Sequence, residues 1–552
     1  AFEAAGFSNA IIAKDAPDDP NWDAEDVRYS TIRWITSNAP SFGAIGPSRM
    51  DPRTGEILDA DVLIEGNFMQ GFRNTYRRWA GPDAMAQSAF PQLAETPSFL
   101  PADLRCDVQA GMLDGAALLR TALLLEGAMP PGSSVPEEFM GDALMWVTLH
   151  EVGHTLGLRH NFRSSTATPP DKLQDRAWTK AHGLTGSVMD YVSPNISPDR
   201  AKQGEYFSTV PGTYDTWAIR FGYGASGESD LAKDAAYAHA IADESTRPGH
   251  EYSTDDDTYP ANALDPRTNI YDLSGDPLAW AKERSSYIAS LWKNGNFEER
   301  ILGENGEYPV LRRAMDTLLQ QYTIAMGMAV KYVGGQHHSR SHKGQPDALP
   351  PLEPVPADAQ RAALDFLSER AFAAKAFDVP PTVLNKLAAD RWSHWGTQSL
   401  FAPTSRVDYN LNDKVFAIQN ALLTNLTAAP LLARLREGEN RTKAPFTLAE
   451  HFDRMTTMLW GDVAPTAAAL KTLDGPSTRR QIQRAYVDRL ANMVVEDSPG
   501  LPDDARALAR LQLTRIDSRA SRALGGEVAM GDATRAHLLE TRARVKRALE
   551  AG

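Results

Sequence analysis

The chain has 552 residues, and its 57 Lys and Arg against 71 Asp and Glu give a net charge of −14 at pH 7. This length exceeds the roughly 250–300 residues at which one hydrophobic core stops growing, so we expect at least two cores. The negative charge argues against nucleic acid as a partner. Because Cys106 is the single cysteine, the sequence excludes an intramolecular disulfide and any multi-cysteine metal site. A metal would therefore need His, Asp or Glu ligands.

Membrane and export signals are missing from the sequence as given. No run of about 18 consecutive apolar residues occurs, so we expect no membrane span. The opening residues, Ala1–Gly6, have neither the basic nor the apolar region of a signal peptide. We therefore expect the chain to be a processed or trimmed product of a longer one.

The first 130 residues predict a mixed α and β region. Residues 27–35 and 56–64 are rich in β-branched and aromatic side chains and predict two strands, connected through a turn at Asp51–Gly55. Ile32 and Trp34 are expected to be buried. From about residue 102 to residue 126 the pattern becomes helical.

The segment His150-Glu-Val-Gly-His-Thr-Leu-Gly-Leu-Arg-His160 carries the strongest chemical signal. His150 and His154 are four residues apart, so on a helix both imidazoles point from one face and can bind one ion. Gly157 can adopt the left-handed conformation that ends a helix and lets His160 return as a third ligand. Three imidazoles leave a fourth tetrahedral position for water, which is the arrangement of a catalytic Zn2+ site.

Glu151 adjoins this water and is the candidate general base, which would pass the proton to the leaving nitrogen. Zinc lowers the pKa of bound water from about 15.7 to about 7, so the predicted reaction is amide hydrolysis without a covalent intermediate. A bare His-Glu-x-x-His also occurs by chance or in structural metal sites. The extension through Gly157 and His160, which fixes five positions in eleven, favours catalysis. Ser134 and Glu137 predict a capping box at the start of the helix.

A second segment, Ser187-Val-Met-Asp-Tyr191, follows the third histidine. With it, the sequence resembles the metzincin clan of zinc peptidases, in which a methionine-containing turn lies beneath the metal. Met189 matches that methionine and implies an apolar floor under the imidazoles. The resemblance implies that Tyr191 reaches the metal or the transition-state oxyanion; the alternative is a tyrosine packed under the site. Asn161 differs from the residues that mark several well-known metzincin subfamilies.

The sequence resembles most closely the large bacterial Met-zincin family, zinc-dependent metalloproteases with an upstream domain of unknown function. The similar segments are residues 28–58, 150–162, 187–191 and 214–223, and the resemblance covers about residues 1–370. It implies an extracytoplasmic protein, periplasmic or secreted, and suggests self-cleavage before Ala1 as a hypothesis. The metzincin layout also implies a sheet edge that binds an extended substrate, for which residues 56–64 are our candidate.

We expect an α+β fold with a metzincin-like catalytic domain, formed by a twisted mixed sheet and the zinc-binding helix. Residues 1–130 would form its N-terminal α/β part, and residues 131–224 its zinc helix, third-ligand turn and methionine turn. Residues 225–280 are acidic and predict an irregular connector. Residues 281–552 show apolar periodicity at three and four residues, which predicts a helical C-terminal domain.

Two groups of side chains allow alternative metal sites. His337, His338 and His342 suit a second metal or a substrate-contacting loop, although a solvated loop is favoured. A Ca2+ site would need carboxylates, but the spacing of an EF-hand is missing. Its candidate ligands are Asp255, Asp256, Asp257 and Asp265. We expect Asp215 and Trp217 to pack the C-terminal side of the catalytic domain, and Cys106 to be a small buried hydrophobe.

The sequence therefore predicts a zinc metalloendopeptidase with one catalytic Zn2+ and a peptide or protein substrate. One alternative is a zinc amidohydrolase or exopeptidase restricted to small or non-protein amides. Another is a non-catalytic binding protein that zinc stabilises. The oligomeric state and the residues preferred beside the cleaved bond do not follow from the sequence.

Overall fold

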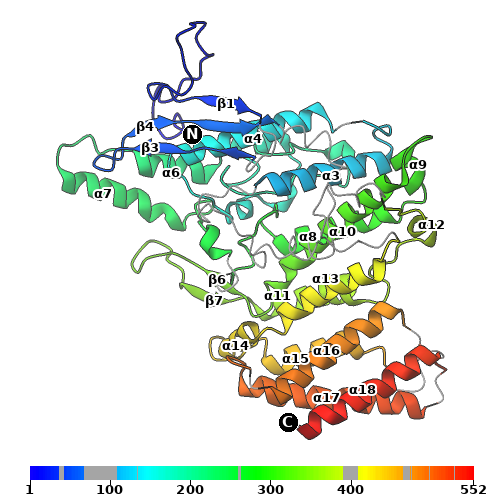
Figure 1. The fold of residues 1–552 in the computed structure, drawn as a ribbon. Coiled ribbons are helices and arrows are strands. Elements are labelled where there is room, and N and C mark those ends of the chain that lie inside the picture. The colour runs from blue at the N-terminus through cyan, green and yellow to red at the C-terminus, as the bar shows by residue number, and fades with distance from the viewer. Residues whose placement is uncertain are drawn as a thin grey trace.

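The computed structural model describes residues 1–36, 43–66, 108–133, 135–258, 263–389, 408–463, 473, 475–496, 498–526 and 529–551. The described parts form an α+β fold in which helices dominate, as expected. Short strands lie at one end of the molecule with helices α4, α6 and α7, and the last helices lie at the other end (Figure 1). Cys106 and Ser134 fall outside the described residues, so the prediction for Cys106 stays open. The capping box predicted from Ser134 and Glu137 is wrong, because the helix begins at Glu137 with Pro136 as its N-cap and without a side-chain cap.

The main sheet near the N-terminus has three described strands in the order β1-β5-β2. The central strand β5 (Val62–Glu65) pairs in parallel with β1 (Ile32–Ile35) and antiparallel with β2 (Ala44–Ile45). Val62 and Ile64 of β5 are buried, whereas Ile32 and Trp34 of β1 are 57% and 54% exposed. The prediction that these two β1 side chains are buried is therefore wrong.

A separate hairpin pairs β3 (Ser48–Met50) with β4 (Ile57–Ala60). The turn predicted at Asp51–Gly55 connects the two strands, and the Gly55 amide donates to the Asp51 carbonyl at 2.8 Å. The expected single edge strand over residues 56–64 is not formed, because this run contributes to two sheets. Its first half is β4, in the two-stranded hairpin, and its second half belongs to β5, which has a partner on each side among the described strands.

Helix α4 (Glu137–Thr155) carries the first two histidines and packs under the sheet, where it contacts β5 and β2. Pro136 precedes its first turn. Glu137 and Glu138 lie in that turn, where their negative charges interact favourably with the positive end of the helix dipole. The helix ends at Thr155, and Gly157 has a φ of 85°, the left-handed conformation that the sequence predicted. The chain therefore turns back on itself immediately before His160.

The region between the zinc-motif turn and the helical half contains several short elements. They are the 3-10 turns Ser164–Ala167, Pro170–Lys172, Arg200–Lys202, Asp243–Thr246 and Asp255–Asp257, and helices α5 (Arg176–His182), α6 (Thr213–Tyr223) and α7 (Leu231–Ala242). Residues 225–280 were expected to be irregular, which is wrong for α7. Asp230 caps that helix by accepting from the Ala232 amide at 2.9 Å, and its apolar Ile241 is buried.

The C-terminal half is helical, as its periodicity predicted. Its long helices α8 and α10 pack against each other, and α3 from the N-terminal half packs on α10 (Figure 1). Helices α16, α17 and α18 pack mutually at the C-terminal end. The elements of this half, with α3, are α3 (Val108–Glu126), α8 (Pro277–Trp292), α9 (Phe297–Leu302), α10 (Tyr308–Val330), β6 (Gln336–His338), β7 (Leu352–Pro354), α11 (Ala357–Leu367), a π-helical turn (Ser368–Phe372), α12 (Pro381–Leu384), α13 (Leu411–Leu426), α14 (Ala429–Gly438), α15 (Leu448–Trp460), α16 (Ser477–Val495), α17 (Asp503–Gly525) and α18 (Asp532–Ala551).

Within the described ranges, no single helix is both long and apolar enough to cross a membrane. The bent pair of α13 and α14 is long and apolar enough only when the two helices are counted together, and by length and composition alone.

We predict that Gly46→Ala destabilises the contact between the sheet and α4. A Cβ at Gly46 would lie 2.1 Å from the backbone oxygen of Glu151, and no side-chain rotation can relieve that clash. The free energy of unfolding should fall by about 1–3 kcal/mol. Gly141→Ala is the matched control on α4, because a Cβ there meets open space and should stabilise the helix by about 0.5–1 kcal/mol. Thermal unfolding of both variants tests this, and equal midpoints would contradict it.

Candidate metal centre

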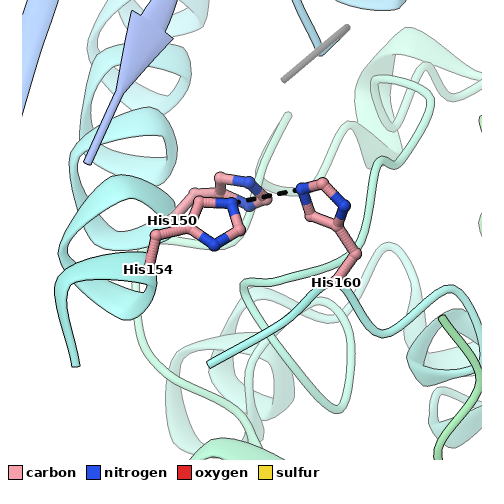
Figure 2. A group of neighbouring side chains, drawn as sticks. All are labelled: His150, His154 and His160. Atoms are coloured by element: carbon pink, nitrogen blue, oxygen red, sulfur yellow. Dashed lines mark hydrogen bonds between the residues drawn. The ribbon is translucent and has the colours of Figure 1, made fainter. Parts of the chain in front are cut away.

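The three histidines of the zinc motif lie together at one point (Figure 2). His150 and His154 project from α4, and His160 reaches them from the loop after Gly157. One ring nitrogen of each lies within 4.8 Å of those of the other two. In the part of the chain that the structure describes, this is the one cluster of three His, Cys, Asp or Glu side chains found with such spacing.

Each histidine uses its Nδ1 atom in a hydrogen bond to an oxygen that can only accept. His150 Nδ1 donates to the Val188 carbonyl at 2.8 Å, and His154 Nδ1 donates to the Leu158 carbonyl at 2.9 Å. His160 Nδ1 donates to Asp255 Oδ1 at 2.8 Å. Because a neutral imidazole carries one proton, these three bonds place the proton on Nδ1 in a neutral ring, and Nε2 is then the unprotonated nitrogen that can accept a hydrogen bond or bind a metal.

The electrostatics of the cluster favour neutral rings at His150 and His154. Burial, together with the neighbouring histidines, holds the pKa of His150 well below its usual value and lowers the pKa of His154 to about 4. The Nε2 atoms of His154 and His160 face each other at 3.1 Å, with the hydroxyl of Tyr191 2.8 Å from His160 Nε2. Neutral imidazoles whose acceptor nitrogens converge are the donor set that a divalent transition metal such as Zn2+ prefers, so the residues fit this ion.

Glu151 and Met189 lie where the sequence motif placed them relative to the helix. Glu151 follows His150 on α4 and is fully buried. Met189 is also fully buried, and a Cβ at Gly153 would lie 2.3 Å from its sulfur. Gly153, which directly precedes His154 in the sequence, therefore allows the thioether to pack directly on α4. The Met189 carbonyl accepts from the Asn161 amide at 3.0 Å, which ties this turn to the third-histidine loop.

Asp215 of α6 fixes the turn that carries Met189, a role that the sequence did not reveal. Its carboxylate accepts from Ser187 Oγ at 2.5 Å, from the Val188 amide at 2.9 Å and from the Gly212 amide at 2.8 Å. The aspartate is buried and therefore supports the same turn whose Val188 carbonyl accepts from His150. The segment 214–223, which resembles the family, contains this aspartate, but the sequence predicts only a packing role for it.

The carboxylates proposed for Ca2+ have other partners. Asp255 accepts from His160, and Asp265 pairs with Arg163 and Arg267 at 2.9 Å each. Burial opposes the ionised form of Asp255, but the hydrogen bond from His160 lowers its pKa below the usual value. Among the described residues these carboxylates form no group around one point, so the structure does not support the calcium prediction.

The second histidine cluster does not form a metal group among the described residues either. His337 and His338 are half-buried on β6, where the His338 amide donates to Asp265 Oδ2 at 2.8 Å. The His342 amide donates to Gln345 Oε1 at 2.7 Å, in the loop between β6 and β7. The favoured solvated loop fits His342 better than it fits the two residues on the strand.

We predict an unusual pH dependence for Asp215→Asn. Burial raises the pKa of Asp215 to about 6 from 3.8, although its three hydrogen bonds oppose the shift. Ionisation therefore costs stability, and the cost develops as the pH rises from about 4 to about 6. The Asn oxygen can still accept from the Val188 and Gly212 amides, while its NH2 group donates to Ser187. The free energy of unfolding of the variant relative to wild type should rise by about 3 kcal/mol between pH 4 and pH 7.

Denaturant unfolding of both proteins at several pH values measures this difference. Asp215→Ala serves as the comparison, because it removes the acceptor and should be less stable than Asp215→Asn throughout the range. A difference between Asp215→Asn and wild type that stays constant with pH would contradict the prediction.

Comparison with known proteins agrees with the histidine geometry. The model of the Met-zincin family matches residues 132–467, more than half of the chain, including the three histidines, Met189 and Tyr191. No curated protein and no solved structure gives a significant match. The match begins later than the resemblance over residues 1–370 and extends further into the helical half. The chain therefore belongs to the Met-zincin family, a metzincin-type family of zinc metalloproteases.

Proposed function

We propose that the protein is a zinc metalloendopeptidase whose single zinc ion is held by His150, His154 and His160. One observation carries the proposal. Three Nε2 atoms converge within a buried site, and each ring is fixed by a hydrogen bond from its Nδ1 atom. The family match supports peptide or protein substrates, and the family resemblance alone supports an extracytoplasmic location.

The chemistry divides between the metal and Glu151. When bound, zinc would lower the pKa of a water molecule and polarise the carbonyl of the scissile bond. Glu151 then takes a proton from the attacking water as the carbon–oxygen bond forms, and delivers it to the leaving nitrogen as the carbon–nitrogen bond breaks. A buried carboxylate on the same helix turn as His150 is well placed for this exchange.

Tyr191 and Met189 complete the proposed site. The Tyr191 hydroxyl lies beside His160 Nε2, so it can donate to the oxyanion that develops on the substrate carbonyl. The Met189 thioether, packed against Gly153, would form the apolar floor of the histidine cluster.

We assign the substrate edge to β2 in place of residues 56–64. Strand β2 is at the edge of the described three-stranded sheet and runs antiparallel to β5. Gly46 follows it and approaches the Glu151 carbonyl closely, so an extended substrate added to this edge would pass beside the general base.

Glu151→Gln should retain zinc but lose hydrolysis by about 10²–10⁴-fold, because the amide cannot accept a proton. Zinc content and the cleavage of casein and short peptides measure this, with removal of the metal by chelator and its return as a second arm. Glu138→Gln, in the first turn of the same helix and half exposed, is the control that should keep activity. Full zinc occupancy of the wild-type protein without cleavage of either substrate would contradict the enzyme assignment, and cleavage by wild type of short peptides alone would contradict endopeptidase activity.

Tyr191→Phe should lower kcat about 10²-fold with little change in KM, since the hydroxyl acts on the transition state. Zinc content should stay at the wild-type level. Tyr206→Phe is the matched control, because Tyr206 is also buried but packs against Phe139 of α4, away from His160. Peptide hydrolysis at several substrate concentrations separates kcat from KM, and an unchanged kcat in Tyr191→Phe would exclude the oxyanion role.

A further inference from the structure

The loop that carries His160 is bound to a segment almost one hundred residues later in the chain. Asn161 Nδ2 donates to the Glu251 carbonyl at 2.9 Å, and Asn161 Oδ1 accepts from the Ser253 amide at 3.1 Å. The Phe162 amide donates to the Ser253 carbonyl at 2.7 Å. Residues 250–258, which we call the clamp segment, therefore run beside the third-histidine loop with three hydrogen bonds to it.

Asp255 of the clamp segment reaches the histidine itself. His160 is 2% exposed and the Asp255 side chain 15% exposed, so their 2.8 Å bond is shielded from water. The other carboxylate oxygen, Oδ2, accepts from Thr254 Oγ1 at 3.1 Å, and Arg159 lies 3.8 Å from it. His150 and His154 donate instead to neutral backbone carbonyls. The third imidazole is thus the one of the three with a charged acceptor.

On the basis of the proposed function, we propose that Asp255 is a positioning residue that orients His160 and raises its affinity for the metal. A carboxylate that accepts from Nδ1 fixes the tautomer and the ring plane and makes Nε2 a stronger donor to a cation. Asp255 touches neither the substrate nor the metal in this role. It acts through the imidazole.

The helical half holds the clamp segment in place. Asp257 accepts from the Thr254 amide at 2.8 Å and from Arg340 Nη2 at 2.6 Å, and Arg340 follows strand β6. The Arg340 guanidinium also lies 5.4 Å from the centre of the Tyr252 ring. These contacts connect both sides of Asp255 to the loop between β6 and β7.

A second link joins the same hairpin to the third-histidine loop. Asp265 accepts from Arg163 at 2.9 Å and from the His338 amide at 2.8 Å. Arg163 and Asp265 are both buried, so this ion pair is well shielded. The position of Asp255 therefore depends on residues of the helical half, and the metal centre extends beyond the zinc motif and the methionine turn.

Zinc affinity tests the proposal directly, measured by competition with a chromophoric chelator on the full chain. Asp255→Ala should weaken zinc binding about 10–100-fold. Asp255→Asn should lie between this variant and wild type, because its amide oxygen still accepts from Nδ1. Asp256→Ala is the matched control and should bind zinc as wild type does, since the Asp256 side chain is 59% exposed and its carboxylate lies 3.7 Å from Arg159. Arg340→Ala should weaken zinc binding by a smaller factor.

Two further readouts separate positioning from a purely structural role. The loss of zinc-binding free energy in Asp255→Ala should exceed the loss of stability of the metal-free protein, measured by its thermal unfolding, and the cobalt-substituted form should have a changed visible spectrum. Wild-type zinc affinity in Asp255→Ala, or weaker binding matched by an equal loss of metal-free stability, would overturn the proposal. Zinc binding by wild type without hydrolysis would instead defeat the proposed function and leave this inference standing.

Discussion

Three hydrogen bonds from imidazole Nδ1 atoms are the constraint on which the site depends. They hold His150, His154 and His160 in one tautomer, with all three Nε2 lone pairs turned inward. A neutral imidazole that donates from Nδ1 offers its Nε2 lone pair to a donor or a cation. Three different parts of the chain each supply one acceptor, on the outer side of one ring.

The three acceptors come from very different distances along the chain. Leu158 is local, since Gly157 reverses the chain just after α4. Val188 comes from the turn that carries Met189, which Asp215 of α6 fixes through three hydrogen bonds. Asp255 comes from the clamp segment, which the loop after β6 holds. Each histidine is therefore oriented by a different segment of the chain.

The difference in sequence separation between each histidine and its acceptor explains which parts of the site the sequence could predict. The helix, the left-handed glycine and the meeting of the three histidines follow from spacings of three to six residues, which local geometry controls. Strand pairing is non-local, and periodicity alone cannot tell that residues 56–64 divide between two sheets. From the sequence, Asp215 and Asp255 can be recognised only as acidic residues, because the sequence does not show which hydrogen-bond donor a carboxylate will have in the folded protein. The acidic run around Asp255 therefore suggested calcium.

The distant position of these partners in the sequence also helps to explain why the chain is much longer than the segment from the zinc motif to Met189. A unit ending near residue 224 would contain the three histidines, Glu151, Met189 and Asp215, yet it would lack the acceptor for His160. It would also lack Asp265, the partner of Arg163. The buried guanidinium would then have lost its carboxylate, and removing one partner of a buried ion pair strongly lowers the stability of a protein. Because Asp265 and Arg340 are tied to the hairpin before α11, the shortest chain that satisfies the site reaches into the helical half. The hairpin of β6 and β7 is then part of the metal centre's support and not a separate addition to it.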